Sequence, residues 1–343
     1  MTDLSAPLSA SEISAEPPET AGREQTARWQ DFLALMKPRV MSLVVFTALT
    51  GLVCAGGTIN PIIAAVAVFC IAIGAGASGA LNMWYDADID AQMRRTRGRP
   101  VPAGRVQPAD ALTLGVVMSL FSVMLMGMAT NWLAAGLLAF TILFYALIYT
   151  MWLKRSTPQN IVIGGLAGAL PPVIGWAAVS GTTPVNAWLL CAIIFMWTPP
   201  HFWALSLYTS EDYAKAGVPM MPVAKGAKST RLQILVYSLL LVPVCLLPVV
   251  TGLGGPAYLA VSGLGGAVFL LVAVRLFLSH AGDAADPRID AGLYDVRAAA
   301  KDARNLFAFS ILYLFLMFAA LLAEHMFGIK PFAALSFLQG FNR

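Results

Sequence analysis

The chain has 343 residues, of which 58% are hydrophobic and only 12% are charged, and its net charge at pH 7 is +4. Ordinary globular domains carry about 25% charged residues, and the few charges here stand in short segments between long apolar runs. This pattern excludes a soluble fold, and so small a net charge gives no argument for nucleic-acid binding.

The first 36 residues differ from the rest of the chain. They are rich in Ser, Ala, Pro and Glu and have no apolar run. A cleavable signal peptide needs a basic start and an apolar stretch, and this segment has neither. We expect residues 1–36 to form a disordered cytoplasmic tail.

Nine apolar stretches follow, each long enough to cross a hydrocarbon layer of about 30 Å as a helix. They are predicted at residues 40–58, 60–84, 111–130, 132–153, 160–180, 185–206, 232–253, 256–274 and 305–323. The pattern predicts an all-α polytopic membrane protein. Residues 37–329 would form one nine-helix domain, and residues 330–343 a periplasmic tail.

The basic residues predict the orientation. All but Lys330 and Arg343, of 22 Lys and Arg, lie before the first stretch or in alternate loops. By the positive-inside rule these segments face the cytoplasm. The N-terminus is then cytoplasmic, and nine crossings place the C-terminus outside. The acidic tail is unlike an organellar presequence, which favours a bacterial inner membrane.

Acidic residues gather at the end of the second stretch, in "NMWYDADID" (residues 82–90). Asn82, Asp86 and Asp90 are spaced four apart and would share one helix face, with Asp88 pointing away. Adjacent carboxylates at this spacing repel each other unless a positive group lies between them. Mg²⁺ typically binds one or two carboxylates together with substrate phosphates, so this loop is a candidate metal–diphosphate site.

Arginines follow the acids directly and suit phosphate oxygens; the candidates are Arg94, Arg95 and Arg99. The alternative interpretation is an interfacial loop whose charges only enforce topology. In the next cytoplasmic segment, Lys154 and Arg155 end the fourth stretch and Asn160 opens the fifth. These bases are either further phosphate ligands or residues that snorkel to the membrane surface.

A second long cytoplasmic loop, between the sixth and seventh stretches, carries Glu211, Asp212 and Lys215. Four crossings separate it from the first loop, so both loops face one compartment and can build one site. The loop is either a lid over a reactive centre or a simple linker.

The sixth stretch contains "TPPHFWALSL", in which Pro199 and Pro200 are expected to kink or break the helix just before His201. An ionisable side chain within a span is a functional candidate, and neutral imidazole also ligates haem iron. The alternative is a structural histidine bonded to a carbonyl that the prolines leave free.

Together these residues resemble a known family. The run "NMWYDADIDAQMRRTRGRPVPAGR" is similar to the first signature, Asn-x-x-x-Asp-x-x-x-Asp, of the UbiA-type intramembrane prenyltransferases. Three further runs are similar to the branch of that family that farnesylates haem: "LKRSTPQNIVIGGLAGALPPVIGW", "TPPHFWALSL" and "EDYAKAGVPMMPV". The resemblance covers roughly residues 30 to 325.

The resemblance implies that a farnesyl group passes from farnesyl diphosphate to a vinyl group of haem B, with addition of water, giving haem O for haem–copper oxidases. It implies Mg²⁺ as cofactor, with Asp86 and Asp90 as ligands and Asn82 orienting them. It implies membrane lipid as surroundings, with haem A synthase or oxidase-assembly factors as candidate partners. The implied substrate-binding residues are Arg94, Arg95, Arg99, Lys154, Arg155, Asn160, His201, Glu211 and Lys215.

This sequence departs from the family pattern at the residues that would bind a second metal ion. Many family members carry a second pair of aspartates four residues apart, whereas here Asp212 is followed by Ala216. Asp212 is therefore a single candidate catalytic carboxylate. The alternatives considered are an aromatic-acceptor prenyltransferase of the quinone type, a transporter and a non-catalytic haem chaperone. A transporter would need acids at mid-span, and the nine predicted stretches contain none.

Overall fold

The computed structural model describes residues 27–283 and 300–333, and all regular secondary structure within them is helical. Six spans are formed by single helices: α3 (Pro61–Tyr85), α5 (Pro108–Ala129), α10 (Val185–Tyr208), α13 (Ala227–Val250), α14 (Pro256–Leu278) and α16 (Lys301–Met326). Helix α2 (Pro38–Cys54) precedes them. Two spans are composite: α6 (Trp132–Leu143) with η1 (Phe144–Leu153) and α7 (Lys154–Ser156), and α8 (Asn160–Ala169) with α9 (Pro171–Ser180).

Eight helices of the described part are long and apolar enough to cross a membrane. A ninth span is the bent pair formed by α1 (Trp29–Leu35) and α2, whose axes meet at 53°. The predicted all-α membrane architecture is therefore confirmed, with eight spans, or nine when the bent pair counts as one.

Local sequence explains where the spans begin. Pro stands at the first turn of α2, α3, α5, α9 and α14, where its missing N–H costs nothing. The side chains of Asn60 and Asn131 cap α3 and α6, accepting hydrogen bonds from the backbone N–H groups of Ile62 and Ala134, each at 2.9 Å. Each cap satisfies a backbone donor that the helix itself leaves unpaired.

The N-terminal tail is shorter than expected, because residues 29–35 form α1 rather than a disordered segment. Leu35 is fully buried in a cluster with Ala80 and Met83 of α3, and Asp31 pairs with Arg105 at 2.8 Å. Apolar packing against α3 thus compensates for the length of a helix too short to be stable alone. Residues 1–26 of the expected tail lie outside the described residues.

Glycines allow the closest helix contacts. A Cβ atom added to Gly76 of α3 would lie 2.6 Å from Cε of Met36, at the bend between α1 and α2. Where α2 crosses α9, a Cβ on Gly175 would collide with the backbone oxygen of Ala48, and one on Gly51 with that of Pro172. Small residues at these crossings let the backbones touch, as membrane helix pairs often require.

Helix α10 continues through Pro199 and Pro200, so the break expected there is absent. Span five is interrupted instead at Leu170, between α8 and Pro171 of α9. A buried acid, Glu324 of α16, accepts hydrogen bonds from the backbone N–H groups of Gly255 (2.7 Å) and Tyr258 (2.9 Å). It stabilises the start of α14, where a helix favours negative charge.

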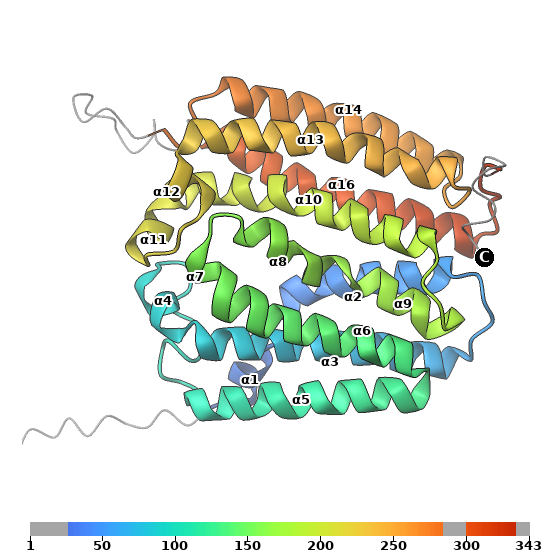
Figure 1. Cartoon of the computed structure of the whole chain (residues 1–343), viewed down its shortest axis with the longest axis horizontal. Helices are drawn as coiled ribbons and strands as arrows, with labels where there is room; N and C mark the ends of the chain where they lie inside the picture. The colour runs from blue at the N-terminus through green and yellow to red at the C-terminus, as the bar shows by residue number, and fades with distance from the viewer. Residues whose placement is uncertain (1–26, 284–299, 334–343) are drawn as a thin grey trace, which may run out of the picture.

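The long helices lie side by side, and the short helices α4 (Ala87–Gln92), α11 (Ser210–Lys215) and α12 (Met221–Lys225) gather at one end of the bundle (Figure 1). The C-terminal end of α16 lies at the opposite end (Figure 1). The two long loops predicted to share a compartment therefore meet at the same end of the bundle.

Candidate active site

The candidate active site begins where α3 ends. Asn82 lies in the last turn of α3, Asp86 caps it and Asp90 lies in α4. The backbone N–H of Asp86 donates to the carbonyl of Asn82, and that of Asp90 to the carbonyl of Asp86. This i to i+4 spacing places the three side chains on one face, and Asp86 and Asp90 are 0% exposed.

A chain of hydrogen bonds fixes the Asn82 amide. Its Nδ2 donates to Asp86 Oδ2 at 2.7 Å and to Thr150 Oγ1 at 3.1 Å. Its Oδ1 accepts a hydrogen bond from Nζ of Lys37 at 2.6 Å. An ammonium group can only donate, so Lys37 determines which end of the amide faces Asp86.

Sequence reasoning missed Lys37 and Thr150. Lys37 stands directly before Pro38, at the start of the first span, and was counted only as a topological base. Its backbone is in the left-handed region, with φ 53°, which is uncommon for a residue other than glycine. The Lys-Pro dipeptide at the mouth of a span is the one sequence signal that could have identified it.

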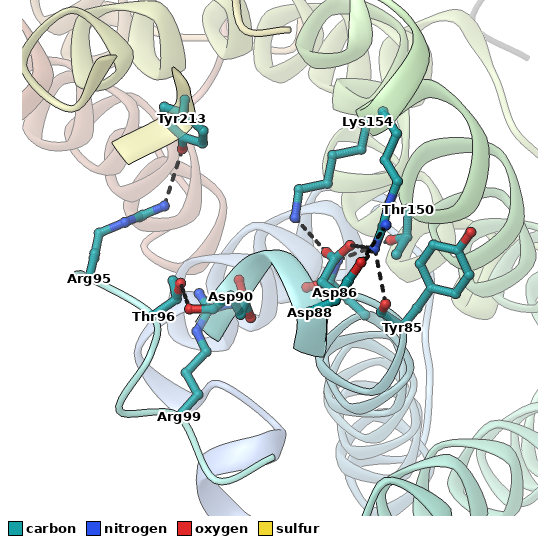
Figure 2. A network of polar contacts seen from close by, with 12 residues as sticks. Tyr85, Asp86, Asp88, Asp90, Arg95, Thr96, Arg99, Thr150, Lys154 and Tyr213 are labelled. Carbon is teal, nitrogen blue, oxygen red and sulfur yellow. Dashed lines mark hydrogen bonds and ion pairs between the residues drawn. The ribbon is translucent and has the colours of Figure 1, made fainter. Parts of the chain in front are cut away.

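A second basic residue of the site, after Lys37, lies at the end of the π-helix η1. Lys154 follows η1 directly, and its Nζ lies 2.5 Å from Oδ2 of Asp86 (Figure 2). Arg155 makes a bidentate pair with Asp88, at 2.7 and 2.8 Å, and its Nη2 lies 3.6 Å from Oδ1 of Asp86. π-helical turns are rare and often occur at functional sites.

Asp90 is held by the loop that follows it. Arg99 Nη1 lies 2.5 Å from Asp90 Oδ2, and the hydroxyl of Thr96 donates to the backbone oxygen of Asp90 at 2.9 Å (Figure 2). Each buried aspartate thus has a base on one carboxylate oxygen, which offsets the like-charge repulsion expected at this spacing.

The loop that follows α3 and the loop that follows α10 contact each other. This agrees with the even number of crossings predicted between them, which places both on one side. Arg95 donates to the hydroxyl of Tyr213 at 3.1 Å (Figure 2), and Arg94 lies 3.7 Å from Asp212. The side chain of Arg94 is 73% exposed, so that ion pair contributes little stability. Tyr213, a buried residue in α11, was not among the predicted site residues.

Other predicted site residues lie apart from this network. Glu211 and Lys215 are exposed, and their side chains make no hydrogen bond or ion pair with the residues the structure describes. Asn160 is buried and donates to the backbone oxygen of Thr157 at 2.6 Å. His201 lies between α10 and α16, bonded to Ser310.

The carboxylates fit a hard metal ion. Oδ1 of Asp86 and Oδ1 of Asp90 are both buried without a hydrogen-bond partner, and such oxygens are the ligands that Mg²⁺ prefers. In residues 27–283 and 300–333, no group of three or more His, Cys, Asp or Glu side chains could hold a metal by itself. A metal here would therefore take its remaining ligands from substrate oxygens or water.

The electrostatics of the cluster are dominated by ion pairing. The bidentate contact with Arg155 holds the pKa of Asp88, which lies outside the spans, below its ordinary value. The guanidinium of Arg155 also lies 4.9 Å from the centre of the Tyr85 ring, a cation–π contact. A set of fixed donors thus surrounds two buried carboxylates, an arrangement suited to binding a metal together with an anion.

Comparison with known proteins agrees with this description. The sequence pattern of the UbiA prenyltransferase family matches residues 44–294, and the chain therefore belongs to the UbiA prenyltransferase family. A curated relative, "Protoheme IX farnesyltransferase" of Caulobacter vibrioides, is 71% identical over 93% of this chain and 97% of its own.

Two solved structures share the fold. A digeranylgeranylglyceryl phosphate synthase covers 86% of this chain and 98% of its own length, with TM-score 0.67 and 16% identity. A UbiA homolog from Archaeoglobus fulgidus, bound to DMAPP and Mg²⁺, covers 83% of this chain and 99% of its own, with TM-score 0.55 and 14% identity. At these identities the likeness extends to the fold alone.

Proposed function

We propose that the protein transfers the farnesyl group of farnesyl diphosphate to a vinyl group of haem B, with addition of water, giving haem O. The observation that carries this proposal is the buried pair Asp86 and Asp90, each with one oxygen that lacks a hydrogen-bond partner and a base bonded to the other oxygen. The 71% identity to a protoheme IX farnesyltransferase over nearly the whole chain supports the same substrates.

The diphosphate end of the donor would bind at the α3–α4 junction. Oδ1 of Asp86 and of Asp90 would hold Mg²⁺, and Asn82 orients the first carboxylate. Mg²⁺, when bound there, neutralises charge on the diphosphate leaving group. A UbiA homolog of the same fold binds DMAPP and Mg²⁺, which supports a Mg²⁺-dependent reaction of a prenyl diphosphate in this protein.

The basic side chains can donate hydrogen bonds both to the aspartate carboxylates and to phosphate oxygens of the substrate. Lys154 and Arg99 each touch a buried carboxylate, yet both carry further donors that can reach phosphate oxygens. Arg94 and Arg95 lie at the contact of the two loops and complete a basic ring around the same end. Asp212 lies across from Arg94 and is a candidate for a contact through the diphosphate rather than for a second metal site.

Two aromatic side chains lie in the span that also carries Lys154. Tyr145 and Tyr149 lie in η1, the helix that ends just before Lys154, with ring centres 5.2 Å apart. Their π faces would stabilise the allylic cation left when the diphosphate departs. The surrounding apolar helices keep bulk water away from that cation until the acceptor has reacted.

The site would face the cytoplasm of a bacterial inner membrane. This assignment rests on the distribution of Lys and Arg, which cluster in the loops that hold α4, α7, α11 and α12. A water-soluble diphosphate head group and its metal would reach Asp86 from that side, while the farnesyl chain would lie among the spans.

The test uses purified full-length protein in detergent with haem B, farnesyl diphosphate and Mg²⁺. Mass spectrometry is expected to find haem that has gained one farnesyl group and one water. The product should disappear with EDTA and in Asp86→Ala. Haem that binds but stays unmodified would refute the transferase and favour a haem chaperone. Product formation with an aromatic acceptor alone would refute the haem acceptor.

A further inference from the structure

His201 of α10 and Ser310 of α16 form a buried pair whose proton positions can be deduced. Nδ1 of His201 lies 2.7 Å from Oγ of Ser310, and that Oγ lies 2.6 Å from the backbone oxygen of Phe307. Because a carbonyl can only accept, Ser310 donates its hydroxyl proton to Phe307 and accepts from His201. The imidazole therefore carries its proton on Nδ1 and a lone pair on Nε2.

The ring is also fixed in orientation. It stacks on Trp197, with ring centres 4.1 Å apart and planes at 17°, and on Phe307 at 4.6 Å and 21°. The indole N–H of Trp197 donates to the backbone oxygen of Ser310 at 2.7 Å. The aromatic neighbours and the hydrogen bond together prevent the imidazole from rotating.

Nε2 of His201 has no hydrogen-bond partner in the described part of the chain, and no carboxylate there contacts the ring. The residue keeps 7% of its surface accessible. Nε2 is not one of the fully buried atoms that lack a partner, so it is an acceptor open to a ligand. A histidine that binds a metal characteristically donates its other ring N–H to a fixed acceptor, which is the role Ser310 has here.

We infer that His201 binds the iron of the haem acceptor through Nε2, with Ser310 as the positioning residue. This inference rests on the proposed function, since haem is taken from that proposal. The bond forms by donation of the Nε2 lone pair into an axial position of the iron, and no electron or proton is transferred. Trp197, Phe202 and Phe307 surround the imidazole and offer apolar faces to a flat porphyrin.

The experiment distinguishes binding through the iron from binding through the porphyrin ring. Purified full-length protein is titrated with ferric haem B and, in parallel, with metal-free protoporphyrin IX, and absorption spectra are recorded. The wild-type protein should bind haem more tightly than the metal-free ring and shift its Soret band to that of a nitrogen-ligated haem. His201→Gly should remove both effects, and added imidazole should restore the Soret band by entering the slot between Trp197 and Phe307.

Two further variants complete the design. Ser310→Ala should weaken haem binding about tenfold without changing protoporphyrin binding, since loss of such a supporting hydrogen bond typically costs 10- to 100-fold in metal affinity. His325→Ala is the matched control: it removes a histidine from α16, the helix of Ser310, where Nδ1 donates to the backbone oxygen of Leu321 at 2.9 Å. It should leave both titrations unchanged.

The outcomes distinguish the two proposals. If wild-type protein makes farnesylated haem but binds haem and protoporphyrin equally, the iron ligand is refuted and the proposed function stands. The ligand is likewise refuted if His201→Gly keeps the wild-type Soret band. If the wild-type protein binds neither porphyrin and makes no product, the proposed function fails and the inference fails with it.

Discussion

Lys37 donates a hydrogen bond to Asn82 across the bend between α1 and α2, with Nζ 2.6 Å from Oδ1. The contact joins residues 45 positions apart and sets the orientation of the amide that faces Asp86. A base outside the family signature thus helps to arrange the signature itself.

Lys37→Met should therefore reduce turnover without unfolding the protein. Hydrogen bonds to charged groups contribute about 1.5–3 kcal/mol, so we expect kcat/KM to fall roughly 10- to 100-fold. The matched control is Arg39→Met, which removes an exposed base two residues later. Equal effects of the two substitutions on product formation would mean that only the overall positive charge matters.

Asp86→Asn and Asp88→Asn form a second matched pair. Asp86 is fully buried and has an oxygen without a hydrogen-bond partner, whereas Asp88 has 60% of its side chain exposed and pairs with Arg155. Loss of the proposed metal ligand should lower kcat about 100-fold or more, since Lewis-acid stabilisation is worth several kcal/mol. Asp88→Asn should change kcat only a few-fold, and isothermal titration with Mg²⁺ and farnesyl diphosphate should show metal binding in that variant alone.

Tyr213→Phe tests the contact between the two loops. It removes the acceptor that holds Arg95 at 3.1 Å, a hydrogen bond worth about 1 kcal/mol. We expect the KM for farnesyl diphosphate to rise several-fold with little change in the thermal midpoint. The control, Tyr237→Phe, removes a hydroxyl from a tyrosine that packs edge-on against Trp203. A KM unchanged in Tyr213→Phe would show that the loops do not need this bond to close the site.

The Asp88–Arg155 pair predicts a specific pH dependence of stability. Arg155 lowers the pKa of Asp88 below its ordinary value, so the pair stabilises the fold above the unfolded pKa of about 3.9. That contribution is lost only as pH falls through the lower folded pKa. The difference in thermal unfolding midpoint between wild type and Asp88→Asn should be small, because the pair is screened by solvent. It should stay constant from pH 8 to 5 and should disappear below about pH 4. A difference that already narrows between pH 7 and 5 would contradict this assignment.

Gly175→Ala should destabilise the bundle, because its new Cβ would collide with the backbone of Ala48 where α9 crosses α2. Overpacking of this kind typically costs about 1–3 kcal/mol, which a thermal melt in detergent would detect. Gly168→Ala, in α8, meets nothing within 4 Å and should be neutral or slightly stabilising. Equal thermal unfolding midpoints for the two variants would mean that α9 and α2 move apart enough to accommodate the new Cβ.

The sequence predictions that were confirmed depend on local patterns, namely helix periodicity and the length of apolar runs. Helix periodicity alone places Asn82, Asp86 and Asp90 on one face, and apolar length alone predicts the spans. The partners of these residues are tertiary: Thr150 reaches Asn82 across 68 positions, and no local pattern encodes such a contact. Helix α1 escaped notice for a similar reason, since its burial depends on the space that Gly76 leaves for Met36.

The π-helix η1 has a consequence for how this enzyme tolerates insertions and deletions. Each residue of an α-helix turns the chain by roughly 100°, whereas a π-helical turn contains more residues and so advances less per residue. Deletion of one residue between Phe144 and Leu153 would change the register between Thr150, which bonds to Asn82, and Lys154, which pairs with Asp86, or the register of both relative to α6. Chain length in this segment therefore constrains the site as tightly as residue identity does, and indels here should be far less tolerated than substitutions at its lipid-facing positions.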